Sequence, residues 1–295
     1  MSEHLPCTLL VDNGSYRPES TLSLRRIAAA LGEEVGHPVH PVSLLHSTRV
    51  KAEDLGGTPA RVFEPFVKEE FEMHGVTSFM IVPLFFGHSA AIYEYVPQRL
   101  AVLREEGVDV EMRLAPCMVD IEDPSNTGVA EILAELVRKK SAEEHLSRPA
   151  VTLVDHGTPR IAVNKVRNFL AGQLKELLVD DAAVVEASSM ERRDGDEYAF
   201  NEPLLENLLG SEGFERDVIL SMLFISPGRH AGPGGDIAQI CAEAEDKHPG
   251  LRTHMSDLFA THPGVVRLLG SRFREGLATD PVTSEVAPPE AAEQA

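Results

Sequence analysis

The stretches TLLVDNGSYRP at residues 8–18 and VTLVDHGTPR at residues 151–160 are the strongest indication of the fold of this chain. Each is an apolar run that ends in Asp and continues with Asn or His, then Gly, then Ser or Thr. A short apolar run bounded by turn-forming residues is typical of a buried β-strand in a parallel sheet. The two stretches therefore predict the same structural element, present twice.

A second pair of motifs follows at the same spacing. In each, an apolar strand-like run leads into Gly and His, as in MIVPLFFGHSAAI and ILSMLFISPGRHAGPGGDI. The separation between Asn13 and His156 along the chain equals, to within a single position, the separation between His88 and His230. Because one offset superimposes both pairs, the sequence predicts a duplicated unit.

Between these motifs, each half alternates strand-like and helix-like segments. Helical periodicity and helix-end signals are clearest in RPESTLSLRRIAAALGEEVG and GVAEILAELVRKK. Such alternation predicts an α/β fold in which each half is a parallel sheet flanked by helices. The strands are expected near residues 8–12, 39–44, 78–85, 109–115, 151–155, 183–187, 217–224 and 251–256.

The predicted duplication divides the chain into three parts. The first repeat is expected at 1–143 and the second at 150–277, joined by the polar, proline-containing stretch SAEEHLSRPA. The last part, ATDPVTSEVAPPEAAEQA at 278–295, has little apolar content and is expected to be a disordered tail. Two folded halves and a tail are therefore the expected domain organisation.

Composition restricts the partners of the chain. Its 27 Lys and Arg against 47 Asp and Glu give a net charge of −20, which opposes binding to nucleic acid. The three cysteines, Cys7, Cys117 and Cys241, form no C-x-x-C pair, which favours reduced thiols over a disulfide framework. The apolar runs are too short to cross a bilayer, and the N-terminus does not resemble an export signal. We therefore expect a cytoplasmic protein without a membrane or nucleic-acid partner.

His156 and His230 each follow the expected end of a strand. In an open parallel α/β sheet, ligands bind beyond the carboxyl ends of the strands, at the point where the strand order reverses. Two loops at that edge would bring both imidazoles to one pocket, and neutral imidazole is a good ligand for divalent cobalt, iron, nickel or zinc. The sequence therefore predicts a metal site at His156 and His230.

Three motifs resemble those of the sirohydrochlorin chelatase family, the class II tetrapyrrole chelatases. They are VDHGT at 154–158, LFISPGRH with GGDI within 223–237, and FATHPGVVRLLGSRF at 259–273. The resemblance covers most of 150–277 and is weaker across 7–140. It implies two tandem flavodoxin-like halves that face each other across a cleft, in a monomer with pseudo-dimeric halves whose further oligomerisation is left open.

The same resemblance implies an activity. The family inserts cobalt or iron into a tetrapyrrole in cobalamin or siroheme biosynthesis, so the divalent metal (cobalt, iron or nickel) is a substrate and no organic cofactor is expected. His156 and His230 correspond to the metal-binding, catalytic pair of the family, and Glu191 to an acidic position that binds metal or relays a proton.

The first repeat departs from this pattern, because Asn13 stands where a first histidine is expected. One complete site is therefore expected, with Asn13 and His88 as substrate contacts from the first repeat. A substrate rich in carboxylates also requires cations near the pocket. The candidate cations are Arg160, Lys165 and Arg229.

Other interpretations remain for the same residues. Taken alone, His156 suits a helix cap, Asn13 before Gly suits a turn, and His88 is equally compatible with local hydrogen bonding. A metal chelatase is the first hypothesis, and a non-catalytic metal or tetrapyrrole carrier of the same fold is the alternative. A flavodoxin-like phosphate-binding or regulatory domain is the third hypothesis, and it leaves the two histidines without a role.

Overall fold

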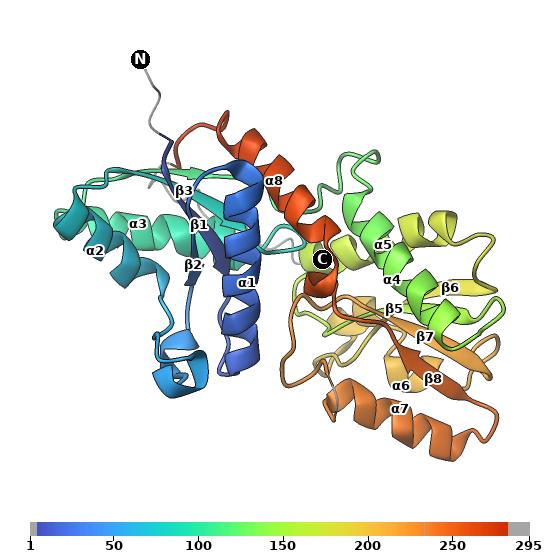
Figure 1. Cartoon of the computed structure of the whole chain (residues 1–295). Coiled ribbons are helices and arrows are strands. Elements are labelled where there is room, and N and C mark those ends of the chain that lie inside the picture. The colour runs from blue at the N-terminus through green and yellow to red at the C-terminus, as the bar shows by residue number, and fades with distance from the viewer. Residues whose placement is uncertain (1–4, 233, 283–295) are drawn as a thin grey trace. The chain divides into compact units, whose positions relative to one another are not determined.

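The computed structural model describes residues 5–232 and 234–282 (Figure 1). Its strands form two separate four-stranded sheets, and every pairing within them is parallel. The contacts divide the chain into two compact units. One contains the described residues up to Met118 and from Val266 onward, and the other contains Val119–Val265.

The first unit contains a sheet with the strand order β2-β1-β3-β4. Its strands are β1 (Cys7–Asp12), β2 (Val39–Ser43), β3 (Ser78–Pro83) and β4 (Glu111–Leu114). Its helices are α1 (Pro18–Val35), α2 (Phe63–His74), α3 (Val96–Glu105) and α8 (Gly264–Gly276), with a π-helical turn at Ala91–Tyr95 before α3. Apolar residues of α2 and α3 pack against one face of the sheet and form a buried core there.

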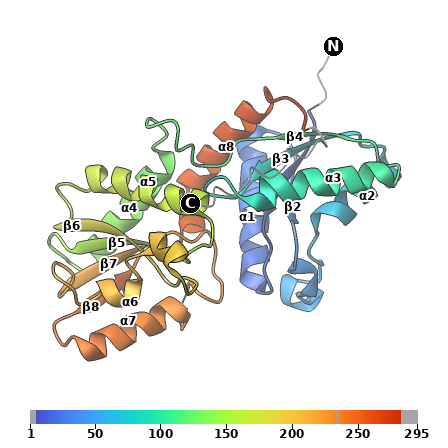
Figure 2. The same ribbon diagram turned by 180° about the vertical axis from the view of Figure 1, so that it is seen from behind.

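The second unit repeats this architecture with the strand order β6-β5-β7-β8. Its strands are β5 (Ala150–Asp155), β6 (Val184–Ser189), β7 (Asp217–Met222) and β8 (Arg252–Met255). Its helices are α4 (Gly128–Glu143), α5 (Ile161–Leu177), α6 (Leu205–Leu208) and α7 (Asp236–Lys247). Helices α6 and α7 cover one face of this sheet and α4 and α5 cover the other (Figures 1 and 2).

The structure confirms the α/β class and the eight expected strands, whose ends differ from the predicted ones by only a few residues. For example, the strand expected at 109–115 is β4, Glu111–Leu114. The central strands β1, β3, β5 and β7 are the most recognisable, because both faces of each sheet are covered and the residues of these strands are mostly apolar and buried. In each sheet the strand order reverses at the central strand, which places a topological switch point beyond β1 and β3, and beyond β5 and β7.

Two helices pack on the sheet of the other repeat. Helix α4 follows β4 in the chain but packs against α5 and β7 of the second sheet. Helix α8 follows β8 but packs in the first unit, where Gly276 lies close against Met80 and Ala115. The compact units therefore divide after residues 118 and 265, and not at the predicted boundaries of 143 and 150.

The segment predicted as a disordered tail, 278–295, lies partly outside the described residues, because residues 283–295 are not described. Its described start differs from the prediction. Pro281 forms a bridge with Arg113 of β4, and the Val282 backbone N–H donates to the Met112 carbonyl at 2.7 Å. These backbone bonds satisfy part of the otherwise open edge of β4.

Within the described residues, none of the helices combines the length and the apolar character that a membrane span requires.

Candidate metal centre

The histidine pair lies at the carboxyl edge of the second sheet. His156 directly follows β5, and His230 lies in the loop that follows β7, so both are at the switch point of this sheet. Their ring centroids are 4.4 Å apart, with an angle of 70° between the ring planes. The structure thus brings together the two imidazoles whose positions in the sequence predict a shared site.

The hydrogen bonds of both rings leave the same nitrogen available. His156 Nδ1 is 3.1 Å from the Gly157 carbonyl, which can only accept, and His230 Nδ1 is 2.6 Å from a carboxylate oxygen of Asp236. Both contacts place the proton on Nδ1 and leave the Nε2 lone pair free to bind a metal. The side chains of His156 and His230 are 44% and 30% exposed, so solvent and ligands reach them.

Glu191 lies beside His156 because two backbone hydrogen bonds align the loops after β5 and β6. Met190 N–H donates to the Asp155 carbonyl at 2.8 Å, and Glu191 N–H donates to the His156 carbonyl at 3.2 Å. The Glu191 carboxylate oxygen Oε1 is 3.4 Å from His156 Nε2. A carboxylate facing an imidazole lone pair is an arrangement that a bound cation stabilises.

The described part of the chain has no group of three or more His, Cys, Asp or Glu side chains arranged to hold a metal ion. The pair and Glu191 therefore do not form a closed structural site of the tetrahedral type. Two imidazole nitrogens beside one carboxylate leave most coordination positions to water or to another ligand. Such openness is typical of a site that exchanges its metal ligands.

The three predicted cations differ in their relation to the pair. Arg229 has a largely exposed side chain, and its Nε is 3.6 Å from the Asp236 oxygen that also accepts from His230. Arg160 immediately precedes α5 and is exposed, and Lys165 is exposed on the second turn of that helix. Of the three, Arg229 contacts a residue that is bonded to a site histidine.

Sequence reasoning missed Asp236 as a member of the site. Asp236 is the first residue of α7, and a signal was present because an acidic residue follows His230 by six positions at the start of a helix. It also missed the buried environment of Asp155, which accepts from Ser189 Oγ at 2.6 Å and from Gly157 N–H at 3.1 Å. Burial raises the pKa of Asp155, and the Ser189 hydrogen bond and the charge of Arg167 oppose that rise.

The loops at the corresponding edge of the first sheet have the same backbone arrangement but lack the candidate metal-binding side chains. Leu45 N–H donates to the Asn13 carbonyl at 3.2 Å, just as Glu191 N–H donates to His156. Asn13 and Leu45 therefore occupy the positions of His156 and Glu191. The ring of the other predicted residue, His88, stacks on Tyr93 with a centroid distance of 4.1 Å and an interplanar angle of 4°.

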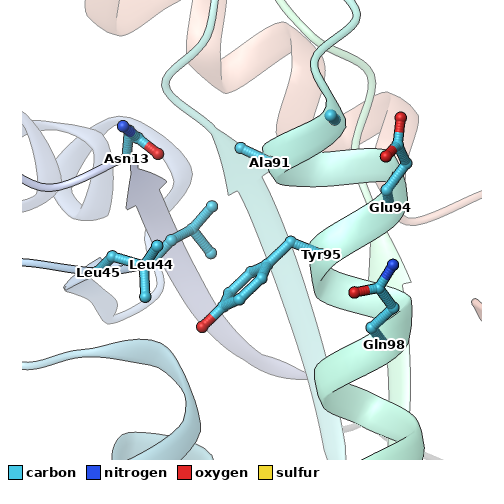
Figure 3. A pocket seen from close by; sticks show the side chains of 8 residues that line it. Asn13, Leu44, Leu45, Ala91, Glu94, Tyr95 and Gln98 are labelled. Atoms are coloured by element: carbon cyan, nitrogen blue, oxygen red, sulfur yellow. The ribbon is translucent and has the colours of Figure 1, made fainter.

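A pocket of about 220 Å³ opens at this edge of the first sheet (Figure 3). Figure 3 shows the Tyr95 ring lying across the pocket toward Leu44 and Leu45. Its lining is formed by Asn13, Leu44, Leu45, Ala90, Ala91, Glu94, Tyr95 and Gln98. Because this lining contains neither His nor Cys, it offers no counterpart of the imidazole pair.

Asp12 ends β1 as Asp155 ends β5, but among the described residues no cation is paired with it as Arg167 is with Asp155. Asp12 Oδ1 is buried without a hydrogen-bond partner among the described residues, and burial raises the pKa of Asp12 from an ordinary 3.8 to about 6 although Ser43 donates to it. The folded protein therefore binds this proton more tightly than the unfolded chain does. The resulting stability is fully present below pH 4 and is lost as the pH rises through 6.

We predict that Asp12→Asn raises the free energy of unfolding at pH 8 by about 2 kcal/mol or more and changes it little at pH 4. Urea unfolding of variant and wild type at both pH values measures the difference. The matched control is Asp54→Asn at an exposed position, which is expected to show no such pH-dependent gain. Equal stability of Asp12→Asn and wild type at pH 8 would contradict a buried, unpaired charge.

The fold of two parallel α/β repeats is similar to that of solved chelatase structures. SirB from Bacillus subtilis with Fe³⁺ superposes with a TM-score of 0.65 over 93% of this chain and 96% of that one, at 15% identity. The sirohydrochlorin chelatase SirB from Bacillus subtilis subspecies spizizenii in complex with cobalt gives 0.64 over 92% and 95%, at 14% identity. CbiX, the terminal enzyme for siroheme biosynthesis in denitrifying bacteria, gives 0.59 over 94% and 100%, also at 14% identity.

Residues 150–276 match the protein family CbiX. This match covers the part of the chain that contains the three motifs resembling the sirohydrochlorin chelatase family. The matched residues include His156, His230, Glu191 and Asp236, which form the candidate metal centre, whereas Asn13 and His88 lie outside them. No curated protein sequence matches the chain.

Proposed function

We propose that this protein is a metal chelatase, a lyase that inserts divalent cobalt or ferrous iron into sirohydrochlorin or a similar tetrapyrrole, in cobalamin or siroheme biosynthesis. The observation that carries the proposal is the pair of imidazoles 4.4 Å apart, each with its Nε2 left free by a hydrogen bond at Nδ1. The complexes of SirB with Fe³⁺ and with cobalt support a metal as the substrate. Its reduced thiols suit a cytoplasmic location.

In the first step, His156 and His230 bind the divalent ion through Nε2. Glu191 adds a negative charge beside His156 and attracts the ion to this edge of the sheet. Because the chain provides few ligands, the ion keeps open positions for incoming nitrogen atoms. The metal is thus held as a substrate that the protein must release.

In the second step, two pyrrole N–H groups lose their protons as two metal–nitrogen bonds form, so that one divalent ion replaces two protons. An imidazole that is released from the metal accepts one proton, and the Glu191 carboxylate accepts the other. Cations at the same edge bind the carboxylates of the tetrapyrrole, which a chain of net charge −20 would otherwise repel. We assign this role to Arg160, Lys165 and Arg229, and retain Asn13 and His88 as substrate contacts.

We predict that Asp236→Ala weakens Co²⁺ binding by about 10- to 100-fold, because Asp236 fixes the ring of His230 and directs its lone pair. Titration calorimetry with Co²⁺ measures the dissociation constant. Asp246→Ala is the matched control, since Asp246 is exposed near the other end of α7 and is expected to leave the affinity unchanged. An unchanged affinity in Asp236→Ala would show that His230 does not depend on this carboxylate.

Purified protein mixed with sirohydrochlorin and Co²⁺ or Fe²⁺ tests the proposed activity, with the visible spectrum reporting the metal complex. We expect formation of the metal complex to be faster than in the same mixture without protein. Tight binding of metal or tetrapyrrole without any acceleration would favour the carrier of the same fold. Binding of neither would overturn both proposals.

A further inference from the structure

A buried arginine lies behind the metal-binding loop. Arg167 is on α5, yet it is only 2% exposed. Its guanidinium donates from Nη1 to Ser189 Oγ and to the Asn201 carbonyl, the latter at 3.0 Å. Burying a charged side chain is costly unless its donors are satisfied. Here Nε donates to Asn168 Oδ1 on the same helix at 3.1 Å, and the Nη1 donors are satisfied by groups around one loop.

The partners of Arg167 hold the residues on both sides of His156. On one side, Ser189 Oγ donates to Asp155 Oδ1 at 2.6 Å, and Arg167 Nη1 is 3.8 Å from the same oxygen. On the other side, Asn201 accepts from the Thr158 N–H at 3.0 Å and donates to the Thr158 carbonyl at 2.9 Å. The guanidinium thus connects two anchors of the loop that carries the imidazole.

The first repeat provides an internal comparison. The offset that relates His156 to Asn13 also relates Arg167 to Leu24, so leucine occupies the position of the arginine there. In that repeat, the corresponding carboxylate of Asp12 has a buried oxygen without a partner among the described residues. The buried cation therefore accompanies the imidazole in one repeat, and both are absent at the corresponding positions of the other.

A cation is not needed to fold this loop. The loop of the first repeat forms the same backbone hydrogen bonds and the same glycine turn without one. There, Arg25 holds the loop after β2 from the surface, by donating to the carbonyls of Leu55, Thr58 and Pro59. The buried network around Arg167 thus requires an explanation beyond the formation of the turn.

We propose that Arg167 is a positioning residue for the metal site, which holds His156 at the distance from His230 that two-nitrogen ligation requires. Through Ser189, Arg167 holds Asp155, the residue before His156. Through Asn201, it holds Thr158, which follows His156 by two positions. This inference rests on the proposed function, because it assigns the network to metal binding. The geometry of the bound metal, and not only the stability of the fold, is then sensitive to Arg167.

The test compares Arg167→Leu, which copies the first repeat, with Arg167→Lys and with wild type. Co²⁺ alone is the probe, and its visible d–d absorption reports the coordination geometry. We expect Arg167→Leu to bind Co²⁺ about 10- to 100-fold more weakly with an altered d–d spectrum, and Arg167→Lys to recover part of the affinity. Circular dichroism at the same temperature establishes that each variant is folded.

Arg25→Leu is the matched control, because it removes loop hydrogen bonds in the first repeat. We expect it to lower the melting temperature without changing Co²⁺ affinity or the d–d spectrum. Where Arg167→Leu does not fold, Asn201→Ala keeps Arg167 but removes the anchor at Thr158, together with one hydrogen bond to the Tyr198 carbonyl. It is expected to weaken Co²⁺ binding in the same way.

A folded Arg167→Leu, or a folded Asn201→Ala, with wild-type affinity and spectrum would overturn the inference and leave the proposed function standing. Protein that binds Co²⁺ equally well after His156→Ala would overturn the proposed function itself, and with it the inference.

Discussion

Replacing either site histidine is expected to reduce metal insertion to the rate of the reaction without protein. Both His156→Ala and His230→Ala remove one of two imidazoles that face each other at 4.4 Å, and a single remaining nitrogen cannot hold the ion in place. We expect the rate to fall by roughly 100-fold or more in each variant. Initial rates of cobalt insertion into sirohydrochlorin, followed by visible absorption, measure the effect.

The double variant distinguishes a shared site from two independent roles. If both imidazoles hold one ion, His156→Ala combined with His230→Ala loses little more activity than either single variant. His74→Ala is the control, because this histidine is exposed at the end of α2 in the first unit, and it is expected to keep full activity. Independent, multiplying losses in the double variant would speak against a single shared metal.

Substituting Gly157 is expected to destabilise the fold strongly. Gly157 has a φ of +91°, and a Cβ at this position would lie 1.8 Å from the Glu191 carbonyl oxygen. Gly157→Ala therefore forces the loops after β5 and β6 apart, in addition to imposing an unfavourable backbone conformation. We expect the free energy of unfolding to fall by about 3 kcal/mol or more, as measured by urea unfolding.

Gly172→Ala is the matched control for this substitution. Gly172 is exposed within α5, and a Cβ there meets nothing within 4 Å. Alanine is favoured over glycine in a helix, so this variant is expected to be more stable than wild type by up to about 1 kcal/mol. A Gly157→Ala protein as stable as wild type would mean that the His156 and Glu191 loops separate without cost.

Much of the fold and part of the site follow from local sequence patterns. The apolar runs that end in Asp12 and Asp155 predicted the central strands, and one constant offset between the two halves predicted their equivalence. Because parallel strands end at a common edge, the positions of His156 and His230 after two such runs were enough to predict that the rings meet. The sequence does not show that Glu191 lies beside His156, since this approach depends on backbone hydrogen bonds between the loops after β5 and β6.

The α/β class, the strands, the duplication and the positions of the two imidazoles could be predicted from local patterns, because each is expressed as periodicity or spacing along the chain. The packing of α4 on the second sheet and of α8 on the first depends on the folded structure, because an amphipathic helix does not specify which apolar surface covers it. The burial of Arg167 behind His156 and the hydrogen bond between Asp236 and His230 likewise depend on contacts between distant segments. A cation on a helix is usually solvated, and its burial becomes favourable only when distant segments of the chain supply its partners.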